Sequence, residues 1–233
     1  MQAIEPDPAI LERMRKDWDE RARENARHYV NNARTEWVDD EFFESGRENV
    51  RNYILNDMTN VCQGKDPKQM TALEIGCGVG RMTRALAATF GQVYGVDVSG
   101  EMIAQAKKNL ANIPNAAVVQ NNGADLRVLG DIQIDFAFSY IVFQHIPSRE
   151  VIRNYVAEVH RLLRPGGLFK FQAQGVTSLV TSADDTWLGV PFSDEDTVRM
   201  AEECGFEPRY RIGADTEAFW LWFFKRPTSS DPR

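Results

Sequence analysis

Residues 73–81 read Leu-Glu-Ile-Gly-Cys-Gly-Val-Gly-Arg, and this stretch decides the fold of the chain. It begins as an apolar strand, turns through three closely spaced glycines and leads into a helical pattern over 81–90. Gly76, Gly78 and Gly80 carry no Cβ, so the backbone can turn tightly and approach a ligand closely. The first amides of the following helix point their N–H groups toward such a ligand. The stretch therefore predicts a ligand-binding turn between a strand and a helix.

An acidic residue stands at the end of the next predicted strand. Asp97 lies 21 residues after Gly76 and closes the strand that is predicted over 93–96. In doubly wound folds, an acidic side chain at this strand tip accepts hydrogen bonds from the hydroxyls of a ribose. The alternative is that Asp97 caps the helix predicted over 100–110. The glycine turn and the acidic strand tip together favour a nucleoside ligand.

The spacing of the glycines discriminates between nucleotide-binding motifs. The dinucleotide fingerprint G-x-G-x-x-G requires glycine at position 81, where this chain has arginine, and its third glycine comes one residue early. No Lys-Ser or Lys-Thr pair follows, so the turn is not a P-loop. A Rossmann-type oxidoreductase with a nicotinamide or flavin cofactor is therefore the less favoured alternative.

Strands alternate with helices beyond residue 62, which predicts an α/β domain with a parallel sheet and helices on both faces. Within 1–60, apolar residues recur every four positions from Ile10 to Ala22, which indicates amphipathic helices. Asp39–Asp40 is expected to cap a second helix, and a third is expected over 47–61. The predicted strands cover 70–75, 93–96, 116–119, 136–139, 168–172, 206–212 and 217–225, and the later helices cover 81–90, 100–110, 148–163 and 194–204.

These patterns predict three parts of the chain. Residues 1–61 form a helical cap or lid, residues 62–227 form the α/β domain, and residues 228–233 form a flexible tail. The cap is too apolar to stay exposed, so its first helix is expected to fold over the ligand cleft. A polar stretch over 174–193 interrupts the domain, and long irregular loops of this kind are usually functional.

Composition excludes several classes of protein. The chain has 233 residues and a formal net charge of −7, so the basic surface that nucleic acid requires is not expected. The longest apolar runs are too short to cross a bilayer, and Met1 is not followed by an apolar leader. The three cysteines lack metal-ligand spacing, so no metal site is expected. Their odd number favours a cytoplasmic location.

Five segments in a fixed order resemble the motifs of class I S-adenosylmethionine-dependent methyltransferases. They are LEIGCGVGRMTRALA at 73–87, GVDVSGEMIAQAK at 95–107, NNGADL at 121–126, IDFAFSYIVFQHIP at 134–147 and RLLRPGGLFKFQ at 161–172. The resemblance covers about residues 70–225 and leaves out the first sixty. It implies a doubly wound sheet of seven strands in the order 3-2-1-4-5-7-6, with the last strand antiparallel. It also implies S-adenosylmethionine as the cofactor.

The resemblance implies roles for individual residues. Glu74 matches an acidic residue that organises the glycine turn, and Arg81 is placed to reach the methionine carboxylate of the cofactor. Asp97 matches the acceptor for the ribose hydroxyls. For the adenine amino group, the amide oxygen of Asn122 is the candidate and Asp125 is the alternative. The other implied cofactor-binding residues are Gly76, Gly78, Gly80, Val98, Met102, Gly123 and Ser139.

The reaction that follows is transfer of a methyl group to an oxygen or nitrogen of a small molecule. A sulfonium methyl is already electrophilic, so the protein mainly has to align a nucleophile with the S–CH₃ bond and exclude water. His145 is the candidate proton acceptor, because it follows a strand at the carboxyl edge of the sheet where ligands bind. The alternative is that His145 only packs against or caps the following helix.

Two other functions remain open at the level of sequence. A regulatory protein that binds the cofactor without turnover would show the same motifs, and an oxidoreductase is the third possibility. The predicted partner is a small-molecule acceptor rather than nucleic acid or a membrane. The identity of the acceptor and the oligomeric state do not follow from the sequence.

Overall fold

The computed structural model describes residues 5–226. Its seven strands follow the order β3-β2-β1-β4-β5-β7-β6, which confirms the strand order expected from the sequence. The chain divides into two compact units, residues 15–121 and residues 1–14 together with 122–233. The tail expected over 228–233 lies outside the described residues.

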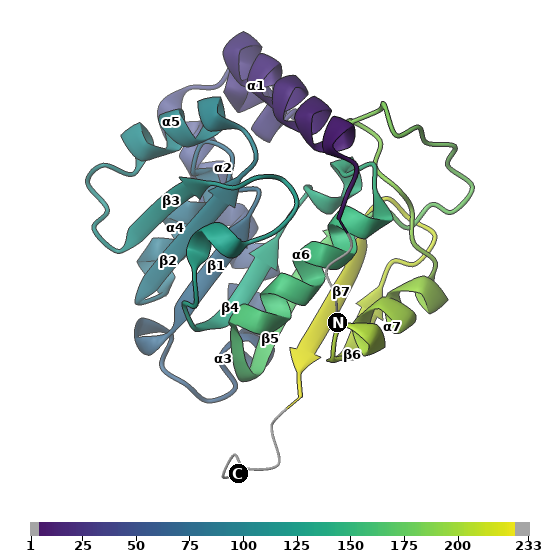
Figure 1. The fold of residues 1–233 in the computed structure, drawn as a ribbon. Helices are drawn as coiled ribbons and strands as arrows, with labels where there is room; N and C mark the ends of the chain where they lie inside the picture. Colours follow the sequence, from purple (N-terminus) through teal and green to yellow (C-terminus); the bar gives the residue numbers. More distant parts are fainter. Residues whose placement is uncertain (1–4, 227–233) are drawn as a thin grey trace. The chain divides into compact units, whose positions relative to one another are not determined.

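In the unit of residues 15–121 the predicted alternation of strands and helices is confirmed (Figure 1). The three strands pair in parallel, so their carboxyl ends lie at the same edge. The register sets Ile75 opposite Val96, which brings the turns after the first two strands together. The elements are β1 (Thr71–Ile75), α4 (Arg81–Thr89), β2 (Gln92–Asp97), α5 (Gly100–Asn109) and β3 (Ala116–Gln120).

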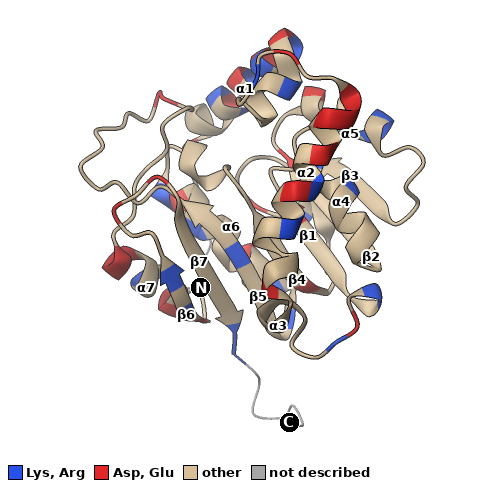
Figure 2. Ribbon diagram, turned by 180° about the vertical axis from the view of Figure 1, so that it is seen from behind, with Lys and Arg blue, Asp and Glu red and all other residues tan. Residues whose placement is uncertain are grey.

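The N-terminal helices correct two expectations. Asp39 and Asp40 do not cap the second helix, because its N-cap is Val38. Both acids belong to the first turn, where their negative charges interact favourably with the positive end of the helix dipole. The helix also continues without a break through Arg47, and Figure 2 shows acidic and basic residues along it. The expected helix over 47–61 is therefore shared between the end of this helix and a short one after it. The elements are α1 (Pro8–Val30), α2 (Asp39–Tyr53) and α3 (Met58–Cys62), with 3-10 turns η1 (Leu55–Asp57) and η2 (Pro67–Gln69).

The apolar faces of α1 and α2 share a core with the glycine turn. Ala22 and Ala26 of α1 and Phe42 of α2 are buried together with Val79 from the turn and Met102 from α5. Trp18, Tyr29, Val30 and Trp37 pack against this cluster. The N-terminal helices therefore bury their apolar stripe on the sheet-bearing part of their own unit.

The second unit holds the remaining four strands. β4 and β5 pair in parallel, whereas β7 runs antiparallel to both β5 and β6, as expected for the last strand. Phe143, Phe169, Phe171 and Phe223 form a buried aromatic core in this unit. The elements are β4 (Ile134–Ser139), α6 (Arg149–Leu162), β5 (Leu163–Ala173), α7 (Asp194–Glu203), β6 (Phe206–Ile212) and β7 (Phe219–Lys225), with 3-10 turns η3 (Arg127–Leu129) and η4 (Phe143–His145).

Two local details of this unit bear on the sequence predictions. The Pro-Gly-Gly sequence at 165–167 lies within β5, which begins at Leu163 and not at the predicted residue 168. A register shift between Ile134 and Phe136 accommodates the extra residues as an irregularity in the β4–β5 pairing. At α7, Ser193 and Asp196 form a capping box, because each side chain accepts a hydrogen bond from the other's backbone N–H.

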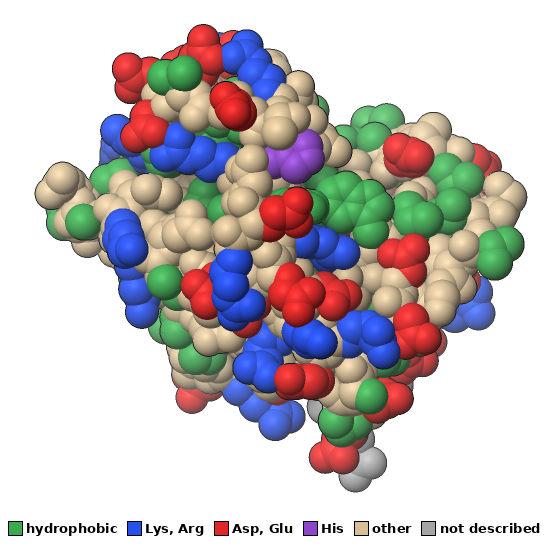
Figure 3. Space-filling view, turned by 90° about the horizontal axis from the view of Figure 1, so that it is seen from above, with side chains coloured by type: hydrophobic (Ala, Val, Ile, Leu, Met, Phe, Trp, Pro, Cys, Tyr) green, Lys and Arg blue, Asp and Glu red, His purple; other side chains and the backbone are tan. Residues whose placement is uncertain are grey.

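Two features of the described residues concern contact with membranes and with nucleic acid: the character of the helices and the charge of the surface. Within residues 5–226, no helix combines the length and the apolar character needed to cross a bilayer. On the face seen in Figure 3, basic and acidic side chains are interspersed. That face therefore shows both signs of charge rather than one continuous basic surface.

Candidate cofactor site and candidate base

The glycine turn adopts the geometry that its sequence predicts. Gly76, Gly78 and Gly80 have φ angles of 73°, 52° and 83°, a region that favours glycine. The amides of Gly76 and Cys77 both donate to Val96 O, at 2.8 and 3.0 Å, which ties the turn to the end of β2. The turn is thus fixed to the neighbouring strand while the backbone at Gly78 has no side chain of its own.

Asp97 lies at the tip of β2 and joins the turn to the start of α5. Its Oδ2 accepts from Gly78 N and its Oδ1 accepts from Ser99 N, both at 2.9 Å. Ser99, rather than Asp97, is the N-cap of α5, because its Oγ accepts from Met102 N. Although Asp97 keeps some exposed surface, loss of solvation raises its pKa to about 6, against the opposing effect of the two N–H donors. The carboxylate is therefore ionised at pH 7 and held beside the glycine turn.

Glu74 has the organising position that the resemblance implies. It is 5% exposed, and its Oε2 accepts from Thr83 Oγ1 at 2.6 Å, so it ties β1 to the first turn of α4. Burial raises the pKa of Glu74 to about 8, and the Thr83 hydrogen bond only partly offsets this effect. The Glu74 carboxyl is therefore mainly protonated at pH 7.

Arg81 turns toward α2. Its guanidinium is buried, and Nη1 donates to Ser45 Oγ at 3.2 Å. With the Asn49 amide oxygen facing Arg81, that oxygen accepts from Nη2 at 3.1 Å and from Nη1 at 3.3 Å. A Cβ at Gly46 would lie 2.4 Å from Arg81 O, so only glycine lets α2 approach α4 so closely. The side chain that was expected to reach the cofactor carboxylate thus anchors α2 in this structure.

Residues of α1 complete the surroundings of the turn. Asp19 Oδ1 accepts from Ser99 Oγ at 2.6 Å and from Glu101 N at 3.2 Å, so it caps α5 from another helix. A Cβ at Gly78 would lie 2.7 Å from Val30 Cγ2, so Val30 forms the wall opposite the turn. Sequence spacing allowed an i,i+4 pair between Asp19 and Arg23, but Arg23 pairs with Glu101 instead, at 3.0 Å. The role of Asp19 was missed because its partners lie some eighty residues away along the chain.

The apolar residues expected beside adenine differ in burial. Val98 is half-buried, whereas Met102 is 1% exposed and belongs to the cluster with Ala22 and Ala26 of α1. Met102 therefore packs under α1 in this structure. A planar ligand that contacted Met102 would have to lie between it and α1.

The segment after β3 uses Asn122 locally, which corrects one assignment. Asn122 Oδ1 accepts from both Ala124 N and Asp125 N at 2.9 Å. These two bonds occupy the two lone pairs of the amide oxygen, so it is not placed to accept from an adenine amino group. Gly123, with φ of 79°, forms the middle of this turn. Asp125, whose Oδ1 accepts from Arg127 N, remains the alternative.

Ser139 is the last residue of β4 in the second unit, and His145 follows this strand. Ser139 is fully buried, and His145 ends η4 with 7% exposure. His145 Nδ1 lies 2.6 Å from Trp187 O, and the two rings are 4.9 Å apart. Because a carbonyl oxygen can only accept, Nδ1 carries the proton and Nε2 carries the lone pair in the neutral ring. That is the tautomer that a general base at Nε2 requires.

The 174–193 loop holds His145 in place. Gly189 N donates to Gln144 O at 2.6 Å and Val190 N donates to Ile146 O at 3.1 Å, so the loop brackets His145 on both sides. Asp185 Oδ1 accepts from Trp187 N at 2.7 Å, which fixes the residue whose carbonyl meets the imidazole. The irregular stretch singled out in the sequence is therefore an ordered support for the candidate base.

Within residues 5–226, no group of three or more His, Cys, Asp or Glu side chains is arranged to hold a metal ion. The residues around the turn do fit an adenosyl cofactor on two observations. The turn at Gly78 has the positive φ of a glycine-rich nucleotide-binding turn, and an ionised carboxylate lies beside it at Asp97.

Known proteins match this chain in the same region. A family model described as a methyltransferase domain matches residues 73–171. A probable S-adenosylmethionine-dependent methyltransferase of Mycolicibacterium smegmatis is 31% identical over 108 residues, covering 46% of this chain and 37% of that protein. The chain spans less than half the length of the first curated relatives it matches.

Solved structures match the fold over nearly the whole chain. Phosphoethanolamine N-methyltransferase 1 of Haemonchus contortus covers all of this chain and 52% of its own length, with a TM-score of 0.69 and 15% identity. The match to magnesium protoporphyrin IX methyltransferase of Synechocystis with bound S-adenosylmethionine covers 97% of this chain and 100% of that chain, with a TM-score of 0.65 and 15% identity. Residues 73–171 are therefore similar to a methyltransferase domain, and the fold is the one found in solved S-adenosylmethionine-dependent methyltransferases, one of them with the cofactor bound.

Proposed function

We propose that this protein transfers the methyl group of S-adenosylmethionine to an oxygen or nitrogen of a small-molecule acceptor. The observation that carries the proposal is the joint between the glycine turn and Asp97, with hydrogen bonds of 2.9 Å from Gly78 N and Ser99 N. It places an ionised carboxylate beside the backbone of the glycine turn. Parallel α/β sheets bind ligands at this carboxyl edge.

The proposed binding roles follow from these contacts. Asp97 accepts from the ribose hydroxyls, Gly76, Gly78 and Gly80 form the turn that the cofactor contacts, and Val98 and Met102 contact the base. Asp125 replaces Asn122 as the proposed acceptor for the adenine amino group. Gly123 and Ser139 remain proposed cofactor-binding residues. Arg81 acts on the cofactor carboxylate only if its bond to Ser45 is exchanged.

The bound cofactor supplies an electrophilic methyl group on a sulfonium. The residues of this chain then have to hold an acceptor in line with it, and good alignment contributes at most about 7–11 kcal/mol to lowering the barrier. His145 is proposed to take the proton of the acceptor at Nε2, since Nδ1 is engaged by Trp187 O. The alternative, in which His145 only packs, uses the same contact to hold the 174–193 loop.

The acceptor is proposed to be partly apolar. Tyr140, which directly follows β4, stacks on Trp220 with ring centroids 5.7 Å apart and an angle of 10°. Ile141 is 40% exposed and has a φ of 55°, which is strained for a β-branched residue and typical of functional turns. Relatives of the chain include an O-methyltransferase acting on malonyl-acyl carrier protein and a sterol C-methyltransferase. Because these relatives methylate different atoms, the proposal that the methyl group goes to oxygen or nitrogen rests on His145 as the proton acceptor.

The helical cap is proposed to act as a lid. The proposed cap is residues 1–61 and the proposed methyltransferase domain is residues 62–227, the division expected from the sequence. Within the unit of residues 15–121, Asp19 bonds to the start of α5 and Val30 faces Gly78, so α1 touches the proposed cofactor site directly. A lid in this place would exclude water from the sulfonium. Removal of residues 1–35 should then abolish turnover, whereas a truncated protein that methylates at the full rate would contradict this role.

The proposed location is the cytoplasm, where the three free and buried thiols, Cys62, Cys77 and Cys204, would remain reduced.

The test of the proposed function is binding of S-adenosylmethionine by calorimetry. The wild type should bind one equivalent, and Asp97→Ala should bind about 10- to 100-fold more weakly, because each charge-assisted hydrogen bond is worth about 1.5–3 kcal/mol. Equal affinities of the two folded proteins would remove Asp97 from the ribose role.

A further inference from the structure

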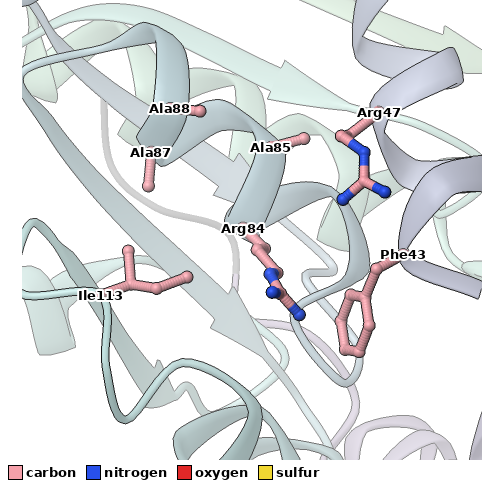
Figure 4. Close-up of a pocket in the computed structure, with 7 residues that line it drawn as sticks. All are labelled: Phe43, Arg47, Arg84, Ala85, Ala87, Ala88 and Ile113. Carbon is pink, nitrogen blue, oxygen red and sulfur yellow. The ribbon is translucent and has the colours of Figure 1, made fainter. Parts of the chain in front are cut away.

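A hollow lies between α2 and α4, on residues that the proposed reaction does not use. It has a volume of about 290 Å³, which is close to the lower end of small-molecule sites. Most of its lining is apolar, and the residues are Phe43, Arg47, Arg84, Ala85, Ala87, Ala88 and Ile113 (Figure 4). Three alanines on one helix leave the space that larger side chains would fill.

Two arginines reach this hollow from different helices. In Figure 4 the side chains of Arg84, on α4, and Arg47, on α2, extend toward the ring of Phe43. The Arg84 guanidinium lies over that ring, with its central carbon 4.7 Å from the ring centroid. The hollow therefore combines an aromatic wall with planar, permanently charged groups.

The charge of Arg84 is not neutralised by a neighbour. Among residues 5–226, no carboxylate forms an ion pair with Arg84, and its guanidinium contacts the Phe43 ring. Arg47, by comparison, pairs with Glu44 at 2.5 Å. In a chain of net charge −7, the uncompensated Arg84 guanidinium thus lies beside an apolar hollow.

We propose that this hollow binds a small amphipathic carboxylate, with its apolar body against Phe43 and the alanines and its carboxylate on Arg84. A guanidinium presents a fork of N–H donors that matches a carboxylate in two parallel bonds. The apolar lining and the charged guanidinium at one side favour a ligand that has both an apolar body and a carboxylate. The site is independent of the cofactor turn, because none of its lining residues contributes to the proposed methyl transfer.

The test uses 1-anilinonaphthalene-8-sulfonate as a fluorescent amphipathic anion, displaced by either phenylacetate or its neutral analogue 2-phenylethanol. The dye should bind saturably, and phenylacetate should displace it about tenfold more effectively than the alcohol, since the bond to Arg84 is charge-assisted. Arg84→Gln should weaken dye binding by a similar factor. Ala88→Leu, which fills the hollow without changing charge, should weaken it as well.

Arg209→Gln is the matched control. Arg209 also lies over an aromatic ring, with its central carbon 4.2 Å from the Phe224 centroid, but it pairs with Glu207 and lies outside the hollow. It should bind the dye as the wild type does. Equal binding by wild type and Arg84→Gln, or equal displacement by phenylacetate and 2-phenylethanol, would overturn the proposal. So would a change of oligomeric mass in Arg84→Gln with dye binding unaltered, since the hollow would then be a contact between copies of the chain.

Discussion

The affinity for S-adenosylmethionine should fall as the pH falls from 7 to 5, because Asp97 titrates in that range. Burial raises the pKa of Asp97 from 3.8 to about 6 in the protein without cofactor. Ribose hydroxyls donate hydrogen bonds, so the bound state requires the ionised carboxylate. Glu74 does not titrate in the same range, because its pKa is about 8. The pH dependence of binding between 5 and 7 is therefore a direct readout of Asp97.

The magnitude follows from the shift. With a pKa of about 6, roughly one-tenth of Asp97 is ionised at pH 5, so the affinity at pH 5 should be about tenfold below its value at pH 7. The same shift affects stability in the opposite direction. The folded state holds the proton more tightly than the unfolded state, so the free energy of unfolding of the unliganded protein gains at most about 3 kcal/mol from this group as the pH falls from 6 through 3.8.

Calorimetric titration with S-adenosylmethionine at several pH values between 5 and 7 measures this effect. Asp97→Asn should bind weakly and with little pH dependence, because its amide does not titrate. His145→Asn is the control for the candidate base, and it should keep the wild-type pH profile of binding. A wild-type affinity that stays constant from pH 7 to pH 5 would refute the assignment of Asp97 to the ribose.

Three further perturbations follow from the same contacts. Gly78→Ala should destabilise the fold by about 1–2 kcal/mol for its left-handed φ alone, and Val30→Ala in the same chain should recover the part due to the 2.7 Å clash, as urea unfolding would show. Asp19→Ala removes two hydrogen bonds to the start of α5 and should cost about 1–2 kcal/mol, whereas Glu20→Ala, in an exposed pair, should change stability by less than about 0.5 kcal/mol. His145→Asn, whose amide can still donate to the loop carbonyl, should lower kcat about 10²- to 10⁴-fold if the imidazole is the base; unchanged kcat would assign His145 to packing.

The fold could be predicted because its signals are local and mutually consistent. The glycines at 76, 78 and 80 all take the positive φ that their spacing implied, and the strands and helices follow their periodicities. The start of α2 was less certain for a physical reason: acidic residues suit both the N-cap and the first helical turn, and Asp39 takes the second place.

The site was predicted less completely, because several of its contacts join distant parts of the sequence. Asp19 finds its partner at Ser99, and Arg81 finds Ser45 on α2, and no local pattern marks either contact. Asn122 is different, since Asn followed by Gly is a known turn signal and its local hydrogen bonds were accessible to sequence reasoning. The contact between His145 and the carbonyl of Trp187 could not be predicted from the sequence, because every residue has a backbone carbonyl.

The most direct test of the proposed methyl transfer uses S-adenosylmethionine labelled in its methyl group, incubated with the protein and a low-molecular-weight metabolite fraction. The account predicts that label moves into a small molecule, that S-adenosylhomocysteine forms in equal amount, and that Asp97→Ala at the same cofactor concentration transfers far less. Binding of the cofactor by the wild type with no transfer of label would contradict the account and identify a cofactor-binding protein without turnover.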